Sequence, residues 1–458
     1  MVIQNVLKIN ENLKPVIQME SLKYRLFTQY EFWRDIPEFA NVSEKDFLNY
    51  KWQTKNSIYD QKTLIKTISN IASKEFIEAA CQGFSRVPMA VRITPYLLSL
   101  IDWNNPWNDP IRKQFIPVST QLIEDHPMLS FDSLHERQDA VTSSLVHRYP
   151  QKALFLALDT CPAYCRFCTR SYAVGQNTNI MKKGNFSVDS KRWEEAFNYI
   201  ESHPELEDIV ISGGDTYNLS AEQIKTIGFR LLQIPQIRRI RFASKGLAVM
   251  PMKVLTDENW LDAITSVLEL GKKLYKEVAL HTHFNHANEI TGITQRAMQK
   301  FFERGLVVRD QTVLLRGIND TSEQMQFLIQ RLSYINIQPY YVFQHDLVKG
   351  VEDLRTSVQT AIDIEKSLRG IIAGFKTPTV AIDAPAGGGK RSIHSYEYYN
   401  RKTGVSVYTA PSVRPGKYFL YFDPLHSLAE NIRNAWKDPK QQQIMCDEAL
   451  NEARKAKF

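Results

Sequence analysis

The stretch Cys161-Pro162-Ala163-Tyr164-Cys165-Arg166-Phe167-Cys168-Thr169-Arg170 places three cysteines within eight residues, spaced C-x3-C-x2-C. The apolar run before it, Ala153–Leu158, reads as a buried strand, so the cysteines follow a strand end. Three thiolates with no obvious fourth ligand suit an iron–sulfur cluster that keeps one iron open. A structural zinc site usually has four ligands in C-x2-C pairs. Chance clustering is the weaker alternative, because the chain has only five cysteines.

The composition is that of an ordinary globular protein of two or three domains. The 458 residues are 43% hydrophobic and 23% charged, with a formal net charge of +7. This charge suits anionic small ligands, and we find no basic run or aromatic motif typical of nucleic-acid binding. We therefore expect a small-molecule ligand and no nucleic acid.

The location of the protein is also constrained by the sequence. Met1–Glu20 has no apolar core of signal-peptide type, and no run approaches about 18 apolar residues, so we expect no membrane span. Outside the cysteine run only Cys81 and Cys446 remain, too few for a disulfide framework. A reducing cytoplasm is the expected compartment.

Residues 1–145 read as a mostly helical N-terminal domain. Helical apolar spacing occurs around Leu22–Trp33, Lys62–Ala79 and Tyr96–Trp103. We see no motif for chemistry here. Packing and oligomerisation are the expected roles, and the protein is expected to be a homo-oligomer.

From about residue 147, strands and helices alternate. Six βα units in a row predict a parallel sheet that curls into a barrel or part of one, with its chemistry at the carboxyl ends of the strands. The expected strands are Ala153–Leu158, Asp208–Ser212, Arg239–Ala243, Val278–His283, Val307–Leu315 and Gln338–Phe343. The expected helices are Lys191–Ser202, one from Ser220, Glu258–Leu274, Ile293–Arg304, Glu323–Ile335 and Glu352–Leu368.

Polar residues collect at the expected strand ends. Ser212-Gly213-Gly214-Asp215 follows the second strand, where the glycines would let a backbone approach a ligand and the acid could bind an amine. His281-Thr282-His283-Phe284-Asn285-His286 ends the fourth, and a mononuclear zinc site is a rival interpretation there. Asp346 follows the sixth strand, where a lone acid is usually solvated.

A second distinctive stretch is Ile382-Asp383-Ala384-Pro385-Ala386-Gly387-Gly388-Gly389-Lys390. It is not a P-loop, because Ala384 stands where that motif needs glycine and Arg391 where it needs serine or threonine. A glycine-rich backbone that delivers a lysine amine suits a Schiff base with a carbonyl cofactor. A glycine turn with an exposed lysine is the alternative.

Together these motifs resemble the radical S-adenosylmethionine (SAM) aminomutases, specifically the lysine 2,3-aminomutase family, over roughly residues 140 to 400. The resemblance implies a partial (β/α)6 TIM-like barrel of the radical SAM type, with an N-terminal helical domain and a C-terminal α+β extension. Together with the pattern of the flanking segments, it predicts three domains, 1–145, 146–370 and 371–458. The matching segments are His147–Pro150, Cys161–Arg170, Ser212–Asp215, His283–His286, Glu289–Thr291, Leu314–Asp320, Gln344–Leu347, Leu354–Thr356 and Asp383–Lys390.

The resemblance also implies roles for individual residues. Cys161, Cys165 and Cys168 would hold a 4Fe-4S cluster, whose open iron binds S-adenosylmethionine. Lys390 would form the Schiff base with pyridoxal 5′-phosphate. The residues expected against S-adenosylmethionine are Gly213, Gly214, Asp215, His283 and Gln311, and those expected at the phosphate are Arg148 and Tyr149.

The substrate is implied by three further residues. Arg170 matches the arginine that pairs with the substrate carboxylate, a bidentate contact that guanidinium groups favour. Asp346 and Asp383 match the two acids that hold the distal ammonium of lysine. Without a cation, two close carboxylates would repel and one would tend to take up a proton. Two acids therefore favour a cationic side chain, lysine first and arginine second.

The implied activity is a 2,3-aminomutase that moves the α-amino group of L-lysine to C3, with an electron donor such as flavodoxin or ferredoxin. A radical SAM enzyme acting on arginine or a protein-bound lysine is one alternative. A non-catalytic iron–sulfur or zinc protein is another. Departures from the family pattern include Lys152, where arginine is frequent, Phe343, where tyrosine is usual, and Ala386 in place of a glycine.

Overall fold

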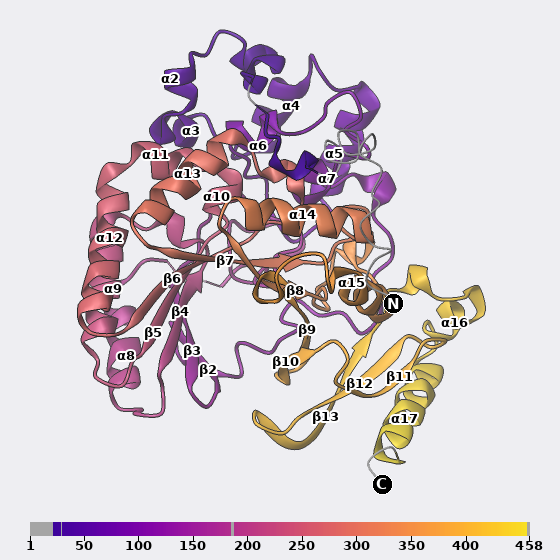
Figure 1. The fold of residues 1–458 in the computed structure, drawn as a ribbon. Helices are drawn as coiled ribbons and strands as arrows, with labels where there is room; N and C mark the ends of the chain where they lie inside the picture. The colour runs from indigo at the N-terminus through magenta and orange to yellow at the C-terminus, as the bar shows by residue number, and fades with distance from the viewer. Residues whose placement is uncertain (1–21, 29, 185–186, 456–458) are drawn as a thin grey trace, which may run out of the picture.

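The computed structural model of the protein describes residues 22–28, 30–184 and 187–455, so the prediction for Met1–Glu20 lies outside the described residues. Its centre is a ten-stranded sheet whose strands follow one another in sequence order (Figure 1). The strands are β1 (Ala140–Thr142), β2 (Leu145–Tyr149), β3 (Lys152–Leu158), β4 (Asp208–Gly213), β5 (Arg239–Ala243), β6 (Glu277–Thr282), β7 (Val307–Val313), β8 (Gln338–Phe343), β9 (Thr379–Ala384) and β10 (Gly389–Ser392).

The middle of the sheet is parallel. Each neighbouring pair from β3 to β9 is parallel, whereas β1, β2 and β10 pair antiparallel at the two ends. All six predicted strands are present, as β3 to β8. The parallel part has one strand more than the six predicted, because Thr379–Ala384 forms β9, whose last three residues the sequence analysis treated as the start of the glycine-rich stretch.

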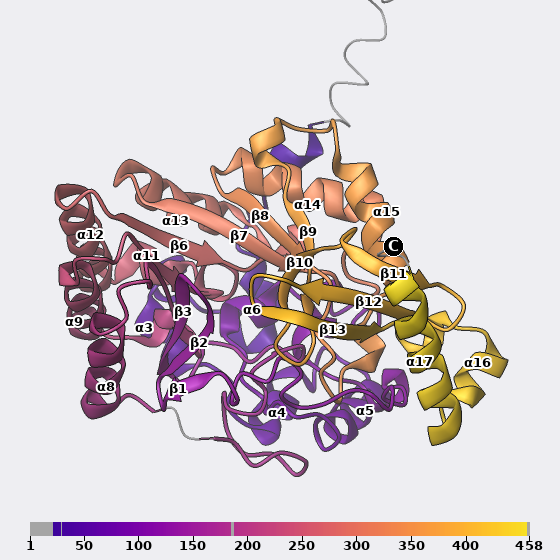
Figure 2. The ribbon, with the colours of Figure 1, turned by 90° about the horizontal axis from the view of Figure 1, so that it is seen from below.

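The predicted crossover helices cover the outer side of the sheet (Figures 1 and 2). Ser220 and Gln223 form the capping box that starts α9. The last predicted helix begins at Val358 instead of Glu352, because the Ser357 side chain caps it at Thr360. The helices are α8 (Ser190–Glu201), α9 (Ala221–Gln233), α10 (Gly246–Val249), α11 (Met252–Thr256), α12 (Glu258–Lys273), α13 (Gly292–Glu303), α14 (Ser322–Tyr334) and α15 (Val358–Leu368).

The N-terminal part is helical but more broken than predicted. Its helices are α2 (Glu44–Phe47), α3 (Tyr50–Lys55), α4 (Gln61–Ile68), α5 (Lys74–Phe84), α6 (Pro95–Ser99) and α7 (Pro110–Phe115). The expected helix over Lys62–Ala79 is two helices, because Asp60 and Ser73 each cap a separate start. The helix expected from Tyr96 to Trp103 ends at Ser99.

The helix predicted over Leu22–Trp33 is wrong. In the described part of this segment the chain forms only 3-10 turns, at Lys23–Arg25 and Phe32–Asp35. The aromatic side chains that suggested a helix pack individually, and Trp33 stacks on Phe47 with ring centroids 4.3 Å apart. The other 3-10 turns are Pro37–Phe39, Ser119–Gln121, Thr216–Asn218, Ala287–Glu289, Glu352–Leu354, Gly374–Lys376 and Leu425–Ser427.

The C-terminal part is a three-stranded antiparallel sheet followed by two helices. The predicted hairpin is confirmed as β11 (Tyr396–Asn400) and β12 (Val405–Ala410), and β13 (Arg414–Phe422) adds the third strand. The helices are α16 (Glu430–Ala435) and α17 (Pro439–Lys455). One hydrophobic core, with members from Phe32 to Ala453, joins all three parts. None of the helices in the described ranges has the length and apolar character needed to cross a membrane.

Candidate active site

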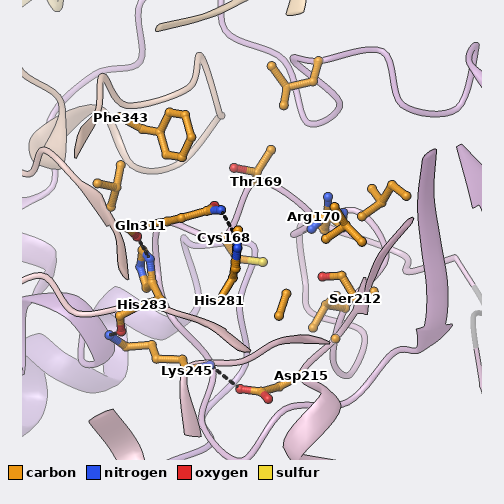
Figure 3. A pocket seen from close by; sticks show the side chains of 18 of the residues that line it. Cys168, Thr169, Arg170, Ser212, Asp215, Lys245, His281, His283, Gln311 and Phe343 are labelled. Carbon is orange, nitrogen blue, oxygen red and sulfur yellow. Dashed lines mark hydrogen bonds between the residues drawn. The ribbon is translucent and has the colours of Figure 1, made fainter. Parts of the chain in front are cut away.

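One cavity of about 410 Å³ opens at the carboxyl ends of the parallel strands. It brings together the residues to which the sequence analysis assigned a role in binding a cofactor or the substrate, from β2 through to β10. Those residues are Arg148, Tyr149, Cys161, Cys165, Cys168, Arg170, Gly213, Gly214, Asp215, His283, Gln311, Asp346, Asp383 and Lys390. Figure 3 shows part of this lining.

The cysteine loop is anchored by its backbone and by one buried ion pair. The amide N–H of Tyr164 donates to the carbonyl oxygen of Arg92 (3.0 Å), and that of Arg166 donates to Gln114 (2.9 Å). The Arg166 guanidinium, 2% exposed, donates to both carboxylate oxygens of Asp353 at 2.9 and 3.0 Å. The N-terminal part, for which the sequence suggested only packing, therefore fixes the loop.

The three thiols all line the cavity, but their apolar neighbours differ, since Cys165 packs against the cluster of Phe167 and Leu315. Met89, Tyr164 and Val174 pack together against Cys161 and Cys168. Burial raises the pKa of all three thiols, that of Cys165 to about 12, and Cys165 and Cys168 both add to the pKa rise of Cys161. Such thiols stay protonated until a metal replaces the proton.

The histidine-rich strand end does not form the rival zinc site. His281 Nδ1 and the Gln311 amide are 2.9 Å apart, and His283 Nδ1 contacts the Gln311 carbonyl oxygen (Figure 3). The ring of His286 instead caps the turn at Ala287–Glu289. Burial lowers the pKa of His281 and of His283 to about 3. Within the described ranges, no three His, Cys, Asp or Glu side chains converge on a single-ion site.

The two glycines at the end of β4, Gly213 and Gly214, are needed for a different reason from the one predicted. A Cβ on Gly213 would lie 2.2 Å from the Leu158 carbonyl oxygen, and one on Gly214 would lie 2.3 Å from that of Thr160. The glycines thus let β4 run directly against the backbone that leads into the cysteine loop. Both still line the cavity.

Asp215 and Lys245 line the cavity beside the cysteine loop, and the Asp215 amide N–H donates to the carbonyl oxygen of Thr160 at 2.9 Å (Figure 3). The Asp215 carboxylate accepts hydrogen bonds from the amide N–H groups of Tyr217 and Lys245, both at 2.8 Å. Two of its acceptor positions are therefore already filled by the backbone. Lys245 Nζ donates to the buried carboxylate of Glu289 (2.8 Å) and to the carbonyl oxygen of His283 (2.9 Å). These contacts fix the His283 backbone at the cavity.

Arg170 has a bidentate partner within the protein. Its Nε and Nη2 donate to the two carboxylate oxygens of Glu136 at 2.9 and 2.8 Å, and the Tyr172 hydroxyl donates to the same acid. Glu136 is buried and lines the cavity, although the sequence analysis did not single it out. A guanidinium held along one edge still presents its remaining N–H groups to a ligand carboxylate.

Lys390 lies on a strand instead of a flexible loop. β9 and β10 form a hairpin in which Lys390 is the direct cross-strand partner of Asp383. The turn between them uses positive φ at Ala386 (57°) and Gly387 (89°). The Lys390 amide N–H donates to the Tyr149 hydroxyl at 2.9 Å. Arg148, next to Tyr149, is held by Asp139 at 2.6 Å.

The lysine end of the cavity concentrates charge. Lys390 Nζ lies 2.8 Å from Asp383 Oδ2. Burial alone would lower the pKa of Lys390, but Asp383 raises it above the usual value, and Asp346 adds to the rise. Burial, followed by the charge of Asp383, raises the pKa of Asp346 to about 7. The Thr169 hydroxyl donates to Asp346 Oδ2 at 2.5 Å.

Several lining residues were missed because their positions carry no motif. Met89 and Glu136 come from the N-terminal part, and only the fold brings them to the cavity. Arg241 lies within a strand, where a cation is expected to be solvated unless the interior of the barrel is recognised. Thr169 could have been found, since it stands between Cys168 and Arg170.

Curated relatives match most of the chain. It is 39% identical to the L-lysine 2,3-aminomutase of Clostridium subterminale over 78% of this chain and 80% of that one. Identity to the Bacillus subtilis L-lysine 2,3-aminomutase is 33%, covering 81% and 74%. The glutamate 2,3-aminomutase of Clostridioides difficile is 34% identical, covering 78% and 79%.

Other comparisons add little. No protein-family model matches the chain. A radical SAM methyltransferase from Sphaerobacter thermophilus aligns over 54% of this chain and 72% of that one, with 18% identity and a TM-score of 0.32, too low to bear on the fold.

Proposed function

We propose that this chain, which belongs to the lysine 2,3-aminomutase family, moves the α-amino group of a cationic amino acid from C2 to C3. The proposed substrate is L-lysine. It is an isomerase that acts on an amino acid as a 2,3-aminomutase. The choice of substrate rests on the two carboxylates of Asp346 and Asp383, which line the same cavity as Lys390 and Arg170.

The charges of the cavity support a cationic side chain. Arg170 at one wall would pair with the substrate carboxylate, while Asp346 and Asp383 would bind a distal cation. Burial, followed by the charge of Asp383, raises the pKa of Asp346 to about 7, so a further cation in the cavity would favour its ionised form. A substrate cation would supply that charge, whereas a side-chain carboxylate would meet two acids.

The donor set fits the cofactors of a radical SAM enzyme. Cys161, Cys165 and Cys168 face the cavity from one loop, and three thiols that each ligate a different iron of a 4Fe-4S cluster need not converge on one point. Gly213, Gly214, Asp215, His283 and Gln311 would contact S-adenosylmethionine beside them.

Pyridoxal 5′-phosphate fits the opposite end. Lys390 presents the amine, and Arg148, Tyr149 and Lys152 line the cavity nearby. Lys152 Nζ lies 4.0 Å from the Tyr149 ring centroid, and burial, followed by Lys390, lowers its pKa to about 8. A phosphate dianion would favour the charged form of this lysine.

The protein's own part in the reaction is positioning and exclusion of water. When bound, these cofactors supply a carbon-centred radical and a ring that delocalises the unpaired electron during nitrogen migration. Arg170, Asp346 and Asp383 would hold the two ends of the substrate, leaving its C2 and C3 between Lys390 and the cysteine loop. The apolar packing of Met89, Tyr164 and Val174 would keep water from the cluster.

We also propose the partial barrel of the radical SAM type. Val210 and Ser212 on β4, and Gln311 and Val313 on β7, alternate along their strands and all face one cavity, as on the inside of a barrel. The domain limits at 145 and 370, the homo-oligomer, the cytoplasmic location and a flavodoxin or ferredoxin donor remain proposals.

A product screen tests the function. The protein would be purified anaerobically, reconstituted with iron, sulfide, pyridoxal phosphate and S-adenosylmethionine, reduced, and offered L-lysine, L-arginine, L-ornithine and L-glutamate together. Mass spectrometry should find the 3-amino isomer of lysine as the main product, and none with Lys390→Ala. Conversion of glutamate alone, or of no cationic amino acid, would refute the proposal.

A further inference from the structure

We propose that the ammonium of Lys390 occupies, in the cofactor-free protein, the position that the distal cation of the substrate takes in the working enzyme. Bonding of Lys390 to the cofactor then opens that position. This inference rests on the proposed function, and adds to it a coupling between cofactor loading and recognition of the substrate.

The surroundings of the Lys390 ammonium are those of a binding site for an alkylammonium ion. Its Nζ lies 2.8 Å from Asp383 Oδ2 and 4.6 Å from the centroid of the Phe343 ring. Asp346 also acts on it electrostatically. A charge-assisted hydrogen bond to one carboxylate, the charge of a second acid and a cation–π contact together stabilise an ammonium ion. We call Asp346, Asp383 and Phe343 the ammonium site.

The fold fixes this arrangement. Lys390 and Asp383 are direct cross-strand partners in the β9–β10 hairpin, so their side chains share one face of the sheet. The Phe343 ring is held by stacking on Tyr341, with centroids 4.9 Å apart and planes at 28°. Thr169 holds Asp346 from the cysteine loop. A free lysine ammonium therefore has a prepared place beside Asp383.

Cofactor loading changes the occupant. The Lys390 ammonium releases a proton, its nitrogen forms a C=N bond to the aldehyde carbon of pyridoxal phosphate, and the aldehyde oxygen leaves as water. The ammonium site then holds two acids and no free lysine ammonium. A cation of alkylammonium or guanidinium type should enter only after this step, and by linkage its presence should tighten cofactor binding equally.

Substitution of Lys390 tests the exchange without the cofactor. Pentylammonium would be titrated calorimetrically into cluster-reconstituted, pyridoxal phosphate-free wild type, Lys390→Met and Lys390→Arg. We expect Lys390→Met to bind at least about 10-fold tighter than the other two, because Lys390→Arg keeps a cation in place. Adding Asp383→Asn to Lys390→Met should abolish the gain. Equal binding by wild type and Lys390→Met, or none by Lys390→Met, would overturn the proposal.

The holoenzyme provides a second test, independent of the folding of any variant. Pentylguanidinium has no primary amine to react with the cofactor. It should bind pyridoxal phosphate-loaded wild type, raise its melting temperature, and leave the cofactor-free melting temperature unchanged. An equal shift in both forms would overturn the exchange. If the two melting temperatures shifted equally but the enzyme converted lysine, the exchange would be refuted and the proposed function would stand. If only the loaded form shifted but no cationic amino acid were converted, the proposed function alone would be refuted.

Discussion

The two ends of the cavity are built in different ways. At the cysteine end, backbone hydrogen bonds and the buried Arg166–Asp353 pair hold a loop whose thiols are neutral. At the lysine end, the ammonium of Lys390 lies 2.8 Å from Asp383, and Asp346 lines the same cavity. The first end is fixed before its cofactor arrives, whereas the second must exchange its partners. Changes at the first should therefore abolish chemistry, and changes at the second should alter selectivity.

Loss of one cysteine should have the largest effect, and it should abolish the chemistry of the cysteine end while leaving cation binding at the lysine end intact. In Cys168→Ser, turnover of lysine should fall at least about 1,000-fold, because the radical chemistry depends on the cluster. Iron content and cluster absorbance should fall with it. Binding of pentylguanidinium to the pyridoxal phosphate-loaded variant should stay within about 2-fold of wild type. Loss of that binding would show that the ends are not independent.

Asp383→Asn should weaken recognition of the substrate without removing the cluster. We expect kcat/KM for lysine to fall about 100-fold or more, because a buried cation loses a charged partner. Steady-state assays beside iron analysis would check this. Asp363→Asn, on an exposed part of α15, is the matched control and should behave as wild type. A similar loss in both variants would contradict the assignment.

Asp346→Asn should make the cofactor-free protein more stable at high pH. An unfolded aspartate ionises near pH ~4, whereas burial and the charge of Asp383 raise the pKa of folded Asp346 to about 7. Between these values the folded state binds more protons, so the carboxyl destabilises the fold increasingly as pH rises. Thermal unfolding should show the variant more stable than wild type at pH 8 and little different at pH 4. A variant that is less stable at pH 8 would argue against the like-charge pair.

Thr169 should show the smallest effect, because it acts through Asp346. Thr169→Val removes the 2.5 Å hydrogen bond, and we expect kcat/KM for lysine to fall about 10-fold, chiefly through KM. Thr169→Ser keeps the hydroxyl and should recover most of the activity. If serine and valine behaved alike, the hydroxyl would have no positioning role.

The sequence predicted the sheet region well and the N-terminal part poorly, for physical reasons. The strands β3 to β8 carry apolar runs between capped helices, so local pattern and fold agree. The segment Leu22–Trp33 has apolar residues whose packing is decided by distant aromatic partners such as Phe47. No local pattern contains that information.

In the site, too, residues that belong to a local motif were predicted and residues that depend on distant partners were missed. The cysteines and Lys390 were found because their spacing is a motif, and the structure brings them into one cavity. Glu136 was missed because its role depends on Arg170, which lies 34 residues further along the chain. The hairpin that pairs Lys390 with Asp383 was missed because a glycine-rich stretch reads as a loop before its strand partner is known.

The central claim is that Asp346 and Asp383 select a distal cation, and one comparison tests it most directly. L-Lysine and L-norleucine share the same carbon chain, but norleucine lacks the distal amine. With the reconstituted, reduced wild-type enzyme, kcat/KM for lysine should exceed that for norleucine at least about 1,000-fold, because norleucine would leave two acids of the cavity unpaired. Equal values for the two substrates, or a preference for norleucine, would contradict the account.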